Sequence, residues 1–182
     1  MKNPIRLLEV LAVVCSLLYT VLIKEGIVWC WLFSLIASLI YLYICFKRRI
    51  YAESLLQLFY VFTTVYGYLN WGEGLSENLP KLNWQMHAAI ALSGLAMVLV
   101  SGKLLSRMSD AATPFIDSFT TIFSIFATLL MINLFPSNWI YWIVIDAVSI
   151  YLYFSRKLYL TSLLFLLYTI ISIDGYLAWS SL

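Results

Sequence analysis

Long apolar stretches separated by short polar loops fill the 182-residue chain. Each stretch approaches the ~20 residues that a helix needs to cross a lipid bilayer. Because backbone groups inside lipid must pair within their own segment, we predict that every stretch is a helix. Glu9 and the lack of a small-residue cleavage site argue against a signal peptide in the first stretch. The seven predicted spans are Ile5–Ile23, Ile27–Phe46, Tyr51–Trp71, Met86–Leu105, Pro114–Phe135, Asn138–Phe154 and Leu158–Trp179.

Composition and charge support an all-α integral membrane protein. Hydrophobic residues make up 63% of the chain and charged residues 11%, which excludes a soluble domain of this size. The net charge of +2 comes without a basic tract, so we expect a lipid bilayer and no nucleic acid as partner. When the chain is threaded through a membrane as seven spans, Lys24 and Lys81 fall on one side of the membrane. The other Lys and Arg residues fall on the opposite side. The positive-inside rule then predicts a cytoplasmic N-terminus and an outer C-terminus.

The chain repeats itself at a spacing of 108 residues. GYLNW at Gly67–Trp71 returns as GYLAW at Gly175–Trp179. Shared hydrophobicity can align Leu with Leu, but it does not align Trp, Arg, Ser and Tyr in one register without a gap. The further matched pairs include Trp31 with Trp139, Arg48 with Arg156, Ser54 with Ser162 and Tyr60 with Tyr168.

This repeat predicts the domain organisation. A first three-helix bundle covers 1–71, an outer loop with a linker helix and connector covers 72–112, and a second three-helix bundle covers 113–182. Four spans separate equivalent helices, so the two halves point the same way across the membrane. Parallel repeats of this kind are a transporter architecture, with the substrate site near the midplane at the repeat interface. The linker helix is rich in Ala, Gly and Ser, which allows close packing, and we assign no role to its one histidine, His87.

The sixth span carries the sharpest candidate site. Trp139, Trp142 and Asp146 are spaced i, i+3 and i+7, which places them on one helix face. Two indoles beside a carboxylate suit a flat cationic ring, through stacking and cation–π attraction. The alternative is two tryptophans of the interfacial belt and an aspartate that bonds a neighbouring helix.

Polar stripes on three other spans complete the candidate site. Polar residues deep in a span are costly and therefore indicate function, although Ser and Thr also link helices. Asp174 lies off the stripe of its own span and nearer the outer end. We predict further substrate contacts at Gln57, Tyr168, Thr121 and Ser124, and gate or rim positions at Asp174, Tyr60 and Trp31.

Signatures of enzymes are absent from the sequence. It contains no H-E-x-x-H, no P-loop and no G-x-S-x-G. The cysteines Cys15, Cys30 and Cys45 stand alone in apolar surroundings, as small core residues do. We therefore predict a protein without catalytic residues, metal or cofactor.

Several stretches resemble the PnuC-type vitamin transporters. They are DSFTTIFSIFATLLM at Asp117–Met131, NWIYWIVIDAVSIYLY at Asn138–Tyr153, RKLYLTSLLFLLY at Arg156–Tyr168, the closing DGYLAW, and RIYAESLLQLFYVFTTVYGYLNW at Arg49–Trp71. The resemblance implies seven transmembrane helices in a 3+1+3 arrangement, like the sugar-transporting SWEET proteins, in a homotrimer of the bacterial inner membrane. It also implies facilitated diffusion of a phosphate-free vitamin, which a cytoplasmic kinase traps by phosphorylation. On this pattern Trp139, Trp142, Asp146 and Gln57 fall on positions that hold the substrate.

Three departures from the family pattern bear on the substrate. Asp146 stands where nicotinamide riboside members look to have Asn, the segment 133–137 lacks charge, and Leu164 replaces a Glu. A carboxylate can accept a hydrogen bond from an aminopyrimidine and balance a thiazolium charge, so thiamine is the first prediction. Nicotinamide riboside, which is also cationic, is the alternative. Two other classes stay open: a proton-coupled carrier that uses Asp146 or Asp117, and a membrane protein that transports nothing.

Overall fold

The computed structural model describes residues 4–47, 51–71, 74–75, 78–108, 113–155 and 159–182, and within these ranges its regular elements are all α-helices. Their positions agree with the apolar stretches of the sequence to within a few residues. The helices are α1 (Pro4–Lys24), α2 (Cys30–Lys47), α3 (Tyr51–Asn70), α4 (Trp84–Met108), α5 (Pro114–Ile132), α6 (Asn138–Ser155) and α7 (Tyr159–Ser180). The prediction of an all-helical protein is confirmed.

Five of these helices are long and apolar enough to cross a membrane, as judged over the described residues: α1, α2, α4, α5 and α7. The other two, α3 and α6, carry buried polar side chains, including Gln57 in α3 and Asp146 in α6. Large apolar side chains such as Leu69 and Leu92 are exposed on the helix surfaces, as lipid-facing residues are.

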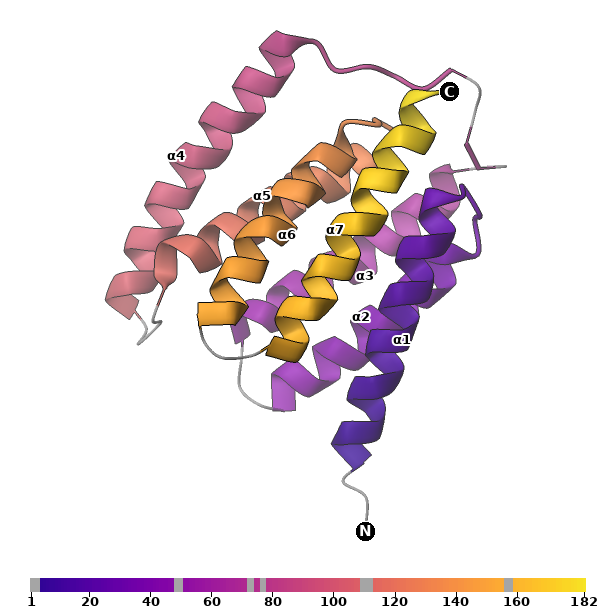
Figure 1. Cartoon of the computed structure of the whole chain (residues 1–182). Coiled ribbons are helices and arrows are strands. Elements are labelled where there is room, and N and C mark those ends of the chain that lie inside the picture. The colour runs from indigo at the N-terminus through magenta and orange to yellow at the C-terminus, as the bar shows by residue number, and fades with distance from the viewer. Residues whose placement is uncertain (1–3, 48–50, 72–73, 76–77, 109–112, 156–158) are drawn as a thin grey trace. The chain divides into compact units, whose positions relative to one another are not determined.

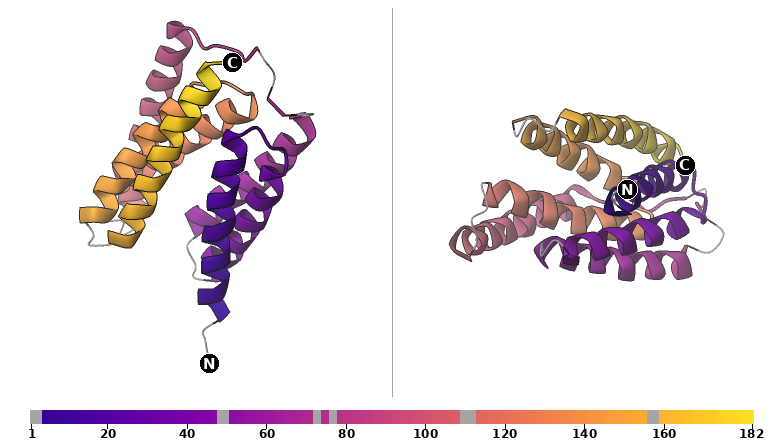
Figure 2. Two further views of the ribbon diagram at one scale, coloured as in Figure 1. Left: turned by 45° about the vertical axis from the view of Figure 1, so that its right-hand side comes forward. Right: turned by 90° about the horizontal axis from the view of Figure 1, so that it is seen from below.

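The chain forms two compact units, Met1–Ser76 and Glu77–Leu182. In the first unit, α2 packs against both α1 and α3. In the second unit, α4 packs on α5, α5 on α6 and α6 on α7. Figures 1 and 2 show α6 (orange) and α7 (yellow) side by side in each view. The helix α4 therefore belongs to the same compact unit as α5–α7.

The 108-residue repeat recurs in the hydrogen bonds of two turns. After α1, the Gly26 N–H donates to the Ile23 carbonyl and the Ile27 N–H to the Leu22 carbonyl, both at 3.0 Å. After α5, the Leu134 N–H donates to the Met131 carbonyl and the Phe135 N–H to the Leu130 carbonyl, again at 3.0 Å. This pair of bonds is a Schellman motif, which ends a helix at a residue with positive φ. That residue is Gly26 (φ 71) in one half and Leu134 (φ 60) in the other.

The repeated Gly-Tyr-Leu-x-Trp also has a structural explanation. A Cβ atom added to Gly67 would lie 2.5 Å from the indole of Trp31, which packs edge-to-face on Trp71 at 5.3 Å and 89°. In the second unit, Trp139 lies against Gly175 in the same way. Its ring packs edge-to-face on that of Trp179, with ring centroids 5.5 Å apart and an interplanar angle of 86°. We call these the first clasp (Trp31, Gly67, Trp71) and the second clasp (Trp139, Gly175, Trp179). Both glycines therefore permit an indole of the neighbouring helix to pack directly against the helix backbone.

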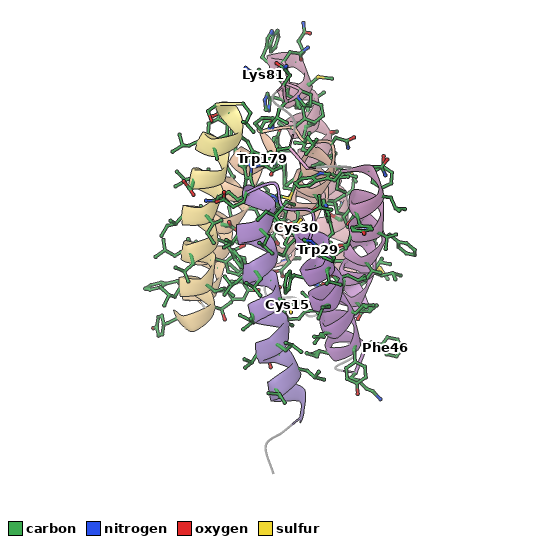
Figure 3. All side chains as sticks on the ribbon, turned by 90° about the vertical axis from the view of Figure 1, so that its right-hand side faces the viewer. Cys15, Trp29, Cys30, Phe46, Lys81 and Trp179 are labelled. Atoms are coloured by element: carbon green, nitrogen blue, oxygen red, sulfur yellow. The ribbon has the colours of Figure 1, made fainter. Side chains whose placement is uncertain are left out.

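Exposed aromatic side chains and buried cysteines both lie near the ends of α2. Trp29 and Phe46, labelled in Figure 3, are both exposed, as expected of aromatic residues near a membrane boundary. The cysteines Cys15, Cys30 and Cys45 are free and buried, which confirms their prediction as small core residues.

Candidate functional site

The buried face of α6 is wide because this helix packs against both α5 and α7. Ile145 belongs to an apolar cluster with Phe123 of α5. Trp139 instead lies against Gly175 of α7. At about 100° per residue, Asp146 falls between the directions of Trp139 and Ile145. Asp146 therefore faces the junction of α5, α6 and α7.

Two aromatic contacts set the register of α6 against α7. Trp139 meets Trp179 near one end, and Tyr153 stacks on Phe165 near the other, with ring centroids 5.2 Å apart and an interplanar angle of 11°. Asp146 is midway between the two α6 residues. It consequently lies level with the middle of α7, around residues 168–172.

That part of α7 carries two of the polar residues singled out in the sequence. Tyr168 is half-buried and Ser172 is buried. Ser149, one turn beyond Asp146 on α6, is also buried. Sequence reasoning missed Ser149, although its i+3 spacing from Asp146 places it on the same helix face.

The Asp146 carboxyl group is the most unusual feature of this junction. The residue is 4% exposed. Within the described ranges, neither a hydrogen bond nor a salt bridge reaches its side chain. The bond to a neighbouring helix, on which the alternative interpretation depended, is thus not found there. A carboxyl group buried without a partner is costly, and at membrane depth it indicates a functional site.

The two tryptophans of the predicted cage occupy different surroundings. Trp139 is 1% exposed, and its ring packs in the second clasp against α7. Trp142 is half-buried and packs against the cluster that contains Phe123 and Ile145. Both indole N–H groups are buried and have no hydrogen-bond partner in the part of the chain that the structure describes. Of the two indoles, Trp142 keeps the larger accessible surface for a substrate.

The polar stripe of α5 divides into two parts. At the start of the helix, the Thr113 hydroxyl donates to both carboxylate oxygens of Asp117 at 3.3 Å. Further along, Thr128 and Ser124 are buried, and the Thr128 hydroxyl donates to the Ser124 carbonyl at 2.7 Å. Thr121 is half-buried between them. Of the predicted α5 contacts, Thr121 therefore keeps the more accessible side chain.

In the first unit, α2 and α3 correspond to α6 and α7 of the second unit. A hydrogen bond between two hydroxyl groups joins them. Ser34 of α2 and Thr64 of α3 share a hydrogen bond of 2.7 Å. Gln57 is buried on the same face of α3, and Tyr60 is half-buried there. Trp31, predicted as a rim residue, is 2% exposed in the first clasp.

Asp174 lies apart from the buried stripe of α7. Its side chain is exposed, whereas Ser172 and Gly175 on either side are buried. The helical spacing predicted this separation. Asp174 is therefore a suitable comparison residue for Asp146, because both are aspartates of the second unit.

Comparison with known proteins identifies the family. A family model described as nicotinamide mononucleotide transporter matches residues 6–181. The chain belongs to this PnuC-type transporter family. The nicotinamide riboside transporter PnuC of Escherichia coli (strain K12) is 27% identical over 177 residues, which cover 81% of this chain and 74% of the relative. PnuC of Neisseria mucosa is 27% identical over 199 residues, covering 99% of this chain and 74% of the relative.

A solved structure shares the fold of this PnuC-type chain. The crystal structure of the vitamin B3 transporter PnuC matches with a TM-score of 0.76 and 25% sequence identity, over 98% of this chain and 82% of that one. The protein is therefore a multi-pass membrane vitamin transporter, which agrees with the prediction that it is not an enzyme. The relatives are named for nicotinamide riboside, so they support this alternative substrate better than thiamine, which was the first prediction.

Proposed function

We propose that this PnuC-type protein carries nicotinamide riboside across the bacterial inner membrane by facilitated diffusion. The observation that carries the proposal is the buried Asp146 carboxyl group, which faces the junction of α5, α6 and α7 without a partner among the described residues. Nicotinamide riboside has a cationic pyridinium ring, a carboxamide and ribose hydroxyl groups. A buried carboxylate attracts such a cation and can accept hydrogen bonds from its amide or hydroxyl groups.

The remaining predicted residues have chemistry that suits the same molecule. The half-buried Trp142 offers an indole for stacking on the pyridinium ring. Tyr168 offers a hydroxyl group near the level of Asp146, and Thr121 and Ser124 offer hydroxyl groups on the α5 stripe. Gln57 offers an amide in the first unit. We propose Trp139 as a support for this site, because its ring already packs in the second clasp.

The proposed architecture extends the same reasoning to the whole chain. All seven helices cross the membrane, with α1–α3 and α5–α7 as parallel repeats and α4 as the linker. The repeated turn and the repeated clasp support this arrangement. The N-terminus is cytoplasmic, the assembly is a homotrimer, and a cytoplasmic kinase traps the vitamin by phosphorylation.

Uptake into proteoliposomes tests the proposed function. Vesicles with the purified protein and no proton gradient should take up labelled nicotinamide riboside until the two sides are equal, faster than protein-free vesicles. Thiamine should enter more slowly. Faster entry of thiamine would keep the transporter and replace the substrate. Uptake that requires an imposed proton gradient would favour the proton-coupled carrier, and uptake of neither vitamin would favour a protein that transports nothing.

A further inference from the structure

The hydroxyl group of Ser172 in α7 is buried and free of partners among the described residues. Ser172 is 2% exposed, and no hydrogen bond reaches its side chain within the ranges that the structure describes. Hydroxyl groups in helices commonly donate to the backbone carbonyl group one turn earlier. Thr169 of the same helix makes this bond to the Phe165 carbonyl, at 2.9 Å. A buried hydroxyl group without any such bond is costly, which indicates that a ligand completes it.

Helix geometry turns Ser172 toward α6. On α7, Gly175 belongs to the second clasp and Phe165 stacks on a ring of α6, so both residues face α6. At about 100° per residue, the direction of Ser172 falls between those of Gly175 and Phe165. Ser172 therefore lies in the interface of α6 and α7, in the stretch of α7 that is level with Asp146.

The first unit shows the same position with a partner. Thr64 stands at the repeat position of Ser172, three residues before the glycine of the first clasp. Its hydroxyl group shares a hydrogen bond of 2.7 Å with Ser34, which lies three residues after Trp31 of that clasp. The two clasps have closely similar ring geometry, which places positions 142 and 172 across from each other in the second unit. Trp142 stands there in place of a serine, and Ser172 thereby loses its partner.

The Trp142 side chain does not replace the missing hydroxyl group. Its ring packs against the apolar cluster that contains Phe123 of α5. Its indole nitrogen can donate a hydrogen bond but cannot accept one. The Ser172 hydroxyl group thus faces α6 at a position that offers an aromatic ring and no acceptor.

Ser172 and Asp146 together offer the two hydrogen-bonding roles that a primary carboxamide needs. The oxygen of a carboxamide accepts hydrogen bonds, and its NH₂ group donates them. An ionised carboxylate only accepts, whereas a hydroxyl group can donate. Asp146 alone would therefore leave the carboxamide oxygen without a donor, and Ser172 supplies one at the same level of the interface.

We propose that the Ser172 hydroxyl group donates a hydrogen bond to the carboxamide oxygen of nicotinamide riboside, whose pyridinium ring stacks on Trp142 and whose amide N–H bonds to Asp146. This inference rests on the proposed function. It makes Ser172 the residue that distinguishes a pyridinium ring with a carboxamide from one without it.

Calorimetric binding to the purified protein in detergent tests this contact with two ligands. They are nicotinamide riboside and the pyridinium riboside that lacks only the carboxamide. We expect wild type to bind nicotinamide riboside more tightly than pyridinium riboside. Ser172→Ala should bind nicotinamide riboside about two- to tenfold more weakly, as the loss of one hydrogen bond predicts, and should bind pyridinium riboside as wild type does.

Two further variants separate ligand recognition from stability. Ser172→Thr keeps a hydroxyl group and introduces the residue type of the repeat position, Thr64, so it should keep the preference for nicotinamide riboside. Ser162→Ala removes another buried hydroxyl group of α7, which donates to the Ile150 carbonyl at 3.3 Å. This variant should destabilise the protein and leave the preference unchanged.

A wild-type preference in Ser172→Ala would overturn the proposal. Equal weakening of both ligands in that variant would also overturn it, because Ser172 would then not contact the carboxamide. Equal binding of the two ligands by wild type would overturn it without any variant. Binding of neither riboside by wild type would instead overturn the proposed function, and this inference with it.

Discussion

Ser34 and Ser38 in the first unit stand at the repeat positions that Trp142 and Asp146 occupy in the second. At the scale of single residues, the two halves differ in chemistry at these two positions. Ser34 ties α2 to α3 through its bond with Thr64. At the matching positions the second unit has an indole and a carboxyl group, and no described residue bonds to that carboxyl group. A shared backbone thus carries a helix-linking hydroxyl group in one half and the proposed ligand-binding groups in the other.

Ser34→Ala should destabilise the protein by about 0.6 kcal/mol, the typical contribution of a hydrogen bond between membrane helices. Reversible unfolding by titration with sodium dodecyl sulfate measures the difference. Ser93→Ala is the matched control, because Ser93 is exposed and its hydroxyl donates to the Ala89 carbonyl of its own helix. An equal effect at both serines would contradict the role assigned to the Ser34–Thr64 bond.

Gly175→Ala should destabilise the protein by about 1–3 kcal/mol, although alanine favours helix, because its Cβ atom would lie 2.7 Å from the Trp139 ring. The same unfolding titration applies. Combining the change with Trp139→Phe removes part of the ring and should recover some of the loss. Strictly additive effects of the two substitutions would show that the clasp does not couple these residues.

At the scale of elements, the turns decide where the helices end. The apolar run of the fifth span continues to Phe135, yet α5 ends at Ile132. The chain turns at Leu134, whose φ is 60°, and Pro136 follows. Hydrophobicity alone does not reveal such a turn. The 108-residue repeat does, because it aligns Leu134 with Gly26.

Gly26→Ala should destabilise the protein by about 1–2 kcal/mol, because a residue with a Cβ atom is strained at φ 71°. Gly26→Asn should lose less stability, since asparagine tolerates this backbone region. Thermal unfolding of wild type and the two variants in the same detergent measures the order of their stabilities. Equal stability of Gly26→Ala and wild type would contradict the Schellman turn after α1.

Much of the candidate site could be predicted from the sequence, for physical reasons. The stripe of Tyr168, Ser172 and Gly175 follows helical spacing, and the structure places these residues on the side of α7 that meets α6. The different surroundings of Trp139 and Trp142 could not be predicted. They depend on which helices flank α6, and spacing within one helix does not contain that information.

At the scale of the whole molecule, the second unit of this PnuC-type transporter holds a carboxyl group at a three-helix junction, without a partner among the described residues. Family membership explains the helices and the repeat, and it suggests nicotinamide riboside through the named relatives. The proposed binding role of Asp146 depends instead on this chain's own residues. It is the central claim, because both candidate vitamins are cations.

Calorimetric binding of nicotinamide riboside and thiamine to the purified protein tests this claim most directly. Asp146→Asn removes the charge while keeping the shape, and Asp174→Asn makes the same change at an exposed aspartate of the same unit. We predict that nicotinamide riboside binds wild type and Asp174→Asn equally well. Asp146→Asn should bind it about ten- to a hundredfold more weakly, as the loss of a charged hydrogen-bond partner predicts. Wild-type affinity in Asp146→Asn would contradict the account.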